Sequence, residues 1–85
     1  VNNFFDTNEL LIYPNPFTAS ITLYTKQEIK NGTLNILNML GEKIYSDELK
    51  NISHEEINLA SQPTGFYFLK IKSGGQLFYR KIIKQ

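Results

Sequence analysis

The stretch GFYFLKIK, residues 65–72, carries the strongest β-strand pattern of this sequence. Its aliphatic and tyrosine residues recur at every second position, which is the period of a strand with one buried face. We expect the buried face to carry Tyr67, Leu69 and Ile71. The opposite face carries Phe66, Phe68, Lys70 and Lys72. A serine and two glycines at 73–75 then predict a tight turn into a second strand, QLFYRKII, at 76–83.

Upstream of this hairpin, short β-prone runs alternate with turn residues at a spacing of roughly 8–12 residues. The runs are LLIY at 10–13, ITLYT at 21–25, and the ranges 33–39, 43–49 and 54–59. We expect 33–39 and 43–49 to pair antiparallel around a turn at 38–42. Apolar residues at 33–40 also fit helical spacing, but Gly32, Asn35 and Asn38 disfavour a helix there. The predicted fold class is all-β, an Ig-like antiparallel β-sandwich of about seven strands.

Size and composition exclude several classes of protein. With 85 residues, the chain is long enough for one small core, and a deep catalytic pocket beside that core is not expected. A formal net charge of +1 argues against nucleic-acid binding. No apolar run approaches the roughly 20 residues that span a bilayer. Without cysteine, the fold uses neither disulfides nor thiolate metal ligands.

The first nine residues differ from the rest in composition. VNNFFDTNE is rich in polar residues and predicts a linker or loosely held N-terminal segment at 1–9, followed by one domain at 10–85. The sequence has no initiator Met and no signal-peptide pattern, and it begins abruptly. We therefore expect it to be a fragment of a longer polypeptide.

No residues in the sequence converge on catalysis or metal binding. His54 is the only histidine, and the run HEEIN lacks the second histidine of the zinc-binding HExxH motif. The carboxylate pairs at 47/48 and 55/56 are adjacent in sequence, so strand geometry directs the members of each pair to opposite faces. We predict no catalytic residue, no metal ligand and no cofactor.

Charge and aromatic residues leave two interpretations open. Residues 57–85 contain five basic residues and no acid, which fits lysines that protect strand edges from aggregation, or a docking surface. The six Phe and five Tyr fit core packing or an exposed recognition platform. The aromatics on neighbouring predicted strands are Tyr24, Phe66, Phe68, Phe78 and Tyr79.

Three motifs, taken together and in order, resemble a known family. They are YPNPF at 13–17 followed by ITLY, NMLGEKI at 38–44, and LASQPTGFYFLKIKSGG at 59–75 running into RKIIKQ. Over residues 10–85 they are similar to the type A C-terminal sorting domain of the type IX, or Por, secretion system. The positions that match the family pattern are Pro14, Asn15, Pro16, Gly41, Pro63, Gly65, Tyr67, Gly74, Gly75 and Lys81.

The resemblance implies a secretion signal, not an enzyme. Such a domain directs an N-terminal cargo domain of the same polypeptide from the periplasm to the cell surface or the medium. The implied partners are an outer-membrane translocon, a shuttle protein and a sortase-like peptidase, which removes the domain and attaches the cargo to the surface. The cut is expected before Leu10, in the linker or upstream of it.

The matching positions also have physical explanations. Two prolines, Pro14 and Pro16, end the first strand, and the Asn15 side chain is suited to cap that turn. Gly41 supplies a positive φ in a hairpin. Tyr67 after Gly65 fits a tyrosine corner, in which the phenol binds upstream backbone. For recognition itself, we expect the exposed edge of the last strand, residues 76–85, to add to a receptor sheet.

Two other functions remain open at this point. The first is a carbohydrate-binding or adhesive Ig-like module of a secreted protein, which predicts an exposed aromatic strip on one sheet. The second is a structural spacer, which predicts no exposed patch and no effect on export.

Overall fold

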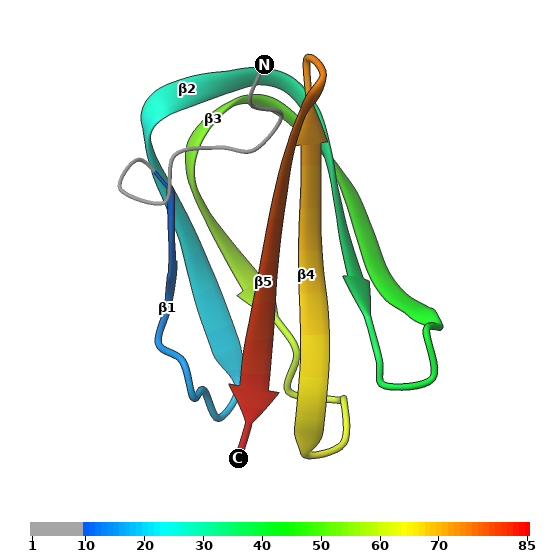
Figure 1. The fold of residues 1–85 in the computed structure, drawn as a ribbon. Helices are drawn as coiled ribbons and strands as arrows, with labels where there is room; N and C mark the ends of the chain where they lie inside the picture. Colours follow the sequence, from blue (N-terminus) through cyan, green and yellow to red (C-terminus); the bar gives the residue numbers. More distant parts are fainter. Residues whose placement is uncertain (1–9) are drawn as a thin grey trace.

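A computed structural model describes residues 10–85, in which every regular element is a β-strand. The strands are β1 (Leu10–Tyr13), β2 (Ser20–Leu37), β3 (Lys43–Asn58), β4 (Gly65–Ser73) and β5 (Gln76–Lys84). All pair antiparallel in one sheet, in the order β1-β2-β4-β5, with β3 also paired to β2 (Figure 1). The expectation of an all-β fold is confirmed. The segment 1–9, expected to be a linker, lies outside the described residues.

The expected number of about seven strands is wrong, because two pairs of predicted runs are continuous strands. The runs 21–25 and 33–39 both belong to β2, and the runs 43–49 and 54–59 both belong to β3. The β2–β3 register shifts between Tyr24 and Ile29, and Asn51 on β3 has a φ of 54°. Such irregularities bend a strand without ending it, so the ladder continues around the corner.

The bend makes the sheet curl around its core. The first part of β2 pairs with β1 and with the last part of β3, whereas its second part pairs with β4 and with the first part of β3. Figure 1 shows β1 and the first part of β2 lying opposite β4 and β5. The buried apolar side chains fill the space between: Leu10, Ile12, Phe17, Ile21, Leu23, Ile29, Leu34, Ile36, Leu49, Ile57, Leu59, Tyr67, Leu69, Ile71, Phe78 and Ile82.

The period-two pattern correctly predicted which faces are buried. On β4 the inward residues are Tyr67, Leu69 and Ile71, as expected. The turn expected at 38–42 joins β2 to β3, and the two strands pair antiparallel from there. The Asn38 side chain holds this turn by accepting bonds from the backbone N–H groups of Leu40 and Glu42 at 2.9 Å each. Gly41 has a φ of 83°, which confirms the predicted positive φ and favours glycine at this position.

Candidate recognition surface

The segment after β1 binds the final residues of β5. Asn15 lies between two prolines, and both the Tyr13–Pro14 and Asn15–Pro16 peptide bonds are cis. The Asn15 Nδ2 donates to the Lys81 carbonyl, and the Asn15 Oδ1 accepts from the Ile83 N–H, each at 3.0 Å. We expected this side chain to cap its own turn; instead it bonds the backbone of a strand 66 and 68 residues further along.

Phe17 extends the same contact with its backbone. Its N–H donates to the Ile83 carbonyl at 2.8 Å, and its carbonyl accepts from the Gln85 N–H at 2.8 Å. Its side chain is buried in the core. We call these four hydrogen bonds, made by Asn15, Phe17, Lys81, Ile83 and Gln85, the clasp. The clasp occupies the outer edge of β5 over 81–85, so the expectation that this part of the edge is exposed is wrong.

A tyrosine corner, as predicted, lies beside the clasp. The Tyr67 hydroxyl donates to the Pro63 carbonyl, and the ring is buried. Gly65, the first residue of β4, pairs with Lys84 of β5. The Lys84 ammonium donates to the Gln62 carbonyl at 2.7 Å, which ties the loop before β4 to the end of β5.

The C-terminus lies at one end of the molecule, which we call the Gln85 end (Figure 1). Eight of the ten predicted site residues lie at this end. They are Pro14, Asn15, Pro16, Gly41, Pro63, Gly65, Tyr67 and Lys81. The turn that contains Gly41 also lies at this end. Its residues Met39 and Leu40 line a hollow of about 210 Å³ together with Pro63 and Phe66. The structure therefore gathers motifs from separate parts of the sequence.

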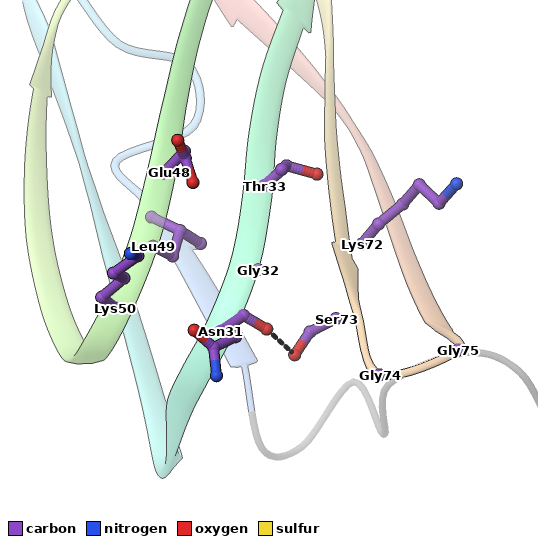
Figure 2. A pocket seen from close by; sticks show the side chains of 10 residues that line it. All are labelled: Asn31, Gly32, Thr33, Glu48, Leu49, Lys50, Lys72, Ser73, Gly74 and Gly75. Atoms are coloured by element: carbon purple, nitrogen blue, oxygen red, sulfur yellow. Dashed lines mark hydrogen bonds between the residues drawn. The ribbon is translucent and has the colours of Figure 1, made fainter.

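The other two predicted residues, Gly74 and Gly75, form the β4–β5 turn at the far end. They help to line an open hollow of about 310 Å³ together with residues of β2, β3 and β4. Figure 2 shows the residues that line it. The Ser73 hydroxyl donates to the Asn31 carbonyl at 2.6 Å and fixes the turn against β2. Gly32 was missed by the sequence analysis, although a Cβ there would lie 2.9 Å from the Lys72 carbonyl oxygen. The sequence carried no signal for it, because Gly32 lies between the predicted runs 21–25 and 33–39.

The outward side of β4 and β5 forms a mixed basic and aromatic surface. We call it the lysine–aromatic face and define it by Phe66, Phe68, Lys70, Lys72, Leu77, Tyr79, Lys81 and Ile83. The exposed fractions are 41% for Phe66, 38% for Phe68 and 50% for Tyr79. Of the five aromatics considered above, Tyr24 is also exposed, and Phe78 alone belongs to the core. The spacer interpretation, which predicted no exposed patch, is not supported.

Two lysines of this face lie over aromatic rings. The Lys81 ammonium is 4.2 Å from the centroid of the Phe66 ring, and the Lys70 ammonium is 5.8 Å from that of Tyr79. These separations fall within the range of cation–π attraction. The side chains therefore stack along the surface.

An acidic pair on the inner side of β3 was also missed by the sequence analysis. Burial and the neighbouring Asp47 carboxylate raise the pKa of Glu55 to about 7. Glu55 Oε2 has no hydrogen-bond partner among the described residues. A hydrogen bond with the Asp47 carboxyl group, which requires a proton on one of the two groups, contributes to the raised pKa. Burial, Asp47 and Glu55 also raise the pKa of the Tyr45 phenol. Glu56 is exposed on the opposite side, as strand geometry predicts.

The described residues contain no group of three or more His, Cys, Asp or Glu side chains placed to hold a metal ion. Within residues 10–85, no helix is long and apolar enough to cross a membrane. Two features of the surface are suited to binding a macromolecule. One is the Gln85 end, which side-chain hydrogen bonds hold in place, and the other is the exposed lysine–aromatic face.

Comparison with known families identifies the domain. Residues 11–85 match the model of the secretion system C-terminal sorting domain. The chain belongs to this family. The sorting domain directs secretion of its cargo across the outer membrane by the type IX system, which implies interaction with the secretion machinery, and its family is not enzymatic.

Solved structures support the fold of the sorting domain. It resembles the crystal structure of a DUF3244 family protein from Bacteroides vulgatus, described as an immunoglobulin-like β-sandwich. The TM-score is 0.77 at 18% identity, covering 91% of this chain and 85% of that chain. No curated protein matches the sequence.

Proposed function

We propose that the type IX machinery recognises the sorting domain as a folded unit, for which the ten matching positions form or support the surface, chiefly at its Gln85 end. The supporting observation is the clasp, because Asn15 and Lys81 belong to motifs far apart in sequence and are joined there by a hydrogen bond of 3.0 Å. A linear peptide signal has no need of such a bond.

The proposal also includes an Ig-like fold for the domain and named partners in the secretion machinery. The curl of β2 and β3 divides the sheet into the two layers of an Ig-like sandwich, which the likeness to the Bacteroides vulgatus protein supports. A shuttle protein and the outer-membrane translocon bind the domain in transit from the periplasm. A sortase-like peptidase then cuts within or before residues 1–9, and the cargo reaches the cell surface or the medium.

A reporter experiment tests the recognition step. Residues 1–85 are fused to a periplasm-directed fluorescent protein in a host with a type IX system, and in the same host without its translocon. We expect export to require the translocon and to fall in the Asn15→Ala variant. The control, Ser73→Ala, removes a hydrogen bond at the far end and should be exported like the wild type. Export independent of the translocon contradicts the proposal.

The cleavage step has its own measurement. The mass of the exported reporter gives the position of its new C-terminus, which we expect within residues 1–9 or upstream of them. A reporter that reaches the surface with the whole domain attached contradicts removal.

A second function, glycan binding after export, is favoured by one observation. Phe66, Phe68 and Tyr79 are exposed on one face, as an aromatic platform for sugars requires. Titration of the purified domain with surface polysaccharide from the host tests it. Binding that is lost in Tyr79→Ala, and unchanged in Tyr24→Ala, supports this function.

A further inference from the structure

We propose that the lysine–aromatic face is the surface by which the sorting domain docks on a protein partner that presents carboxylates around an apolar patch. This inference rests on the proposed function and names the contact surface and the chemistry of the partner.

The apolar part of the face is built like the centre of a protein–protein interface. Phe66 and Phe68 stand on the outward side of β4, and Tyr79 of β5 lies opposite Lys70. Met39 and Leu40, which are 64% and 83% exposed, extend the apolar surface beyond Phe66. Contiguous exposed apolar groups of this kind mark binding sites, and aromatic anchors supply most of the binding energy at such sites.

The charged part of the face determines that the partner's contact surface is negatively charged. Lys70, Lys72 and Lys81 surround the rings, and residues 57–85 contain no acid. Because the Lys81 and Lys70 ammonium groups already lie over Phe66 and Tyr79, less side-chain freedom is lost when a carboxylate binds them. A hollow of about 380 Å³, lined by Lys70, Lys72 and Leu77, adds a place for one acidic side chain.

The same groups suit a glycan less well than a protein. A sugar hydroxyl both donates and accepts hydrogen bonds, and binding sites for sugars supply acceptors as well as donors. Among the eight side chains that define the face, the three ammonium groups donate only, and the Tyr79 hydroxyl is the one that can accept. The aliphatic side chains Leu77 and Ile83 have no role toward sugar hydroxyls, whereas they match an apolar protein surface.

Charge reversal on the face tests the inference with a matched control. Lys70→Glu with Lys81→Glu changes the face, and Lys26→Glu with Lys30→Glu makes the same change of net charge on exposed positions of β2. Both variants keep a charged side chain, so a role of these lysines in preventing aggregation is preserved. We expect the fused reporter of the first variant to be exported about tenfold less, because attraction to carboxylates becomes repulsion. The second variant should be exported within about twofold of the wild type.

Thermal unfolding of both purified variants shows whether either loss arises from unfolding. If the first variant unfolds, the same test uses Lys70→Gln with Lys81→Gln, for which we expect a smaller loss of export. Equal export of the face and control variants, with the wild type exported through the translocon, overturns the docking surface and leaves the proposed function intact. A wild-type fusion that is not exported overturns the proposed function instead.

Photo-crosslinking identifies the chemical class of the partner. A benzoylphenylalanine at position 79 is compared with one at position 24, which is also exposed but lies on β2. We expect an adduct with an outer-membrane or periplasmic protein at position 79 and none with that protein at position 24. Adducts with lipopolysaccharide at position 79, or the same protein adduct at both positions, overturn the inference.

Discussion

The two ends of the molecule are spanned by the same strands but closed by different means. At the Gln85 end, the Asn15 amide and the Tyr67 phenol reach backbone groups of other segments. At the far end, Gly74 and Gly75 make the turn, and Gly32 lets β4 approach β2 closely. One end therefore depends on specific side chains, and the other depends chiefly on the absence of side chains. Most family-motif positions lie at the first end.

The largest effect is expected where the clasp joins the core. Phe17 is buried and also supplies two of the four clasp bonds through its backbone. Phe17→Ala should lower the free energy of unfolding by about 3–5 kcal/mol, because it leaves a cavity under the Gln85 end. Urea denaturation measures the change. A loss below about 1 kcal/mol would show that the two ends are less different than the structure indicates.

The next largest effect compares the two ends by the loss of side-chain hydrogen bonds at each. Asn15→Ala removes two side-chain bonds and should cost about 1–3 kcal/mol, whereas Ser73→Ala removes one exposed bond and should cost about 0.5–1 kcal/mol. Urea denaturation of both variants is again suitable. Hydrogen exchange at Ile83 and Gln85 should accelerate in the first variant alone. Equal acceleration in both variants contradicts the separation of the ends.

A smaller effect is expected at the tyrosine corner. Tyr67→Phe keeps the buried ring and removes the bond to the Pro63 carbonyl, so it should cost about 1 kcal/mol. Thermal unfolding measures it. The exposed Tyr13 of β1 provides the control, since Tyr13→Phe should leave stability nearly unchanged.

The smallest effect is expected away from both ends, at the acidic pair. Because the fold raises the pKa of Glu55 from about 4.5 to about 7, the folded state binds its proton more tightly than the unfolded state. The contribution of this group to stability is therefore greatest at low pH and declines as pH rises from about 5 through about 7. Glu55→Gln should flatten this decline in thermal unfolding, and the exposed control Glu56→Gln should not. An unchanged slope in Glu55→Gln contradicts the pairing with Asp47.

Local patterns were enough to predict the strands but not how they join. Alternation placed Tyr67, Leu69 and Ile71 in the core because period two is a property of neighbouring residues. The polar stretch at 26–31 carries no alternating pattern and was interpreted as a gap, whereas the backbone ladder crosses it. Ladder hydrogen bonds do not depend on side-chain polarity, so sequence alone could not reveal this continuity.

The sequence motifs predicted which residues belong to the site, but not which of them bind one another. The motifs identified Asn15 and Lys81, yet nothing in either motif states that one binds the other. The inward position of Glu55 was missed for a related reason, since a carboxylate in a weakly alternating strand predicts an exposed side chain. Its burial depends on the bend of β3, which brings its two halves around the same core.

The clasp also sets an order of events during synthesis. Asn15 leaves the ribosome 66 and 68 residues before the two groups that it binds. Until residues 81–85 emerge, the segment after β1 has no backbone to pair with, and β5 cannot complete the edge of β4. Contacts of such long sequence separation carry a large loop-closure entropy cost, which slows their formation. A chain interrupted before residue 81 contains β1 to β4 but cannot form the clasp, so the Gln85 end is the last part of the domain that synthesis completes.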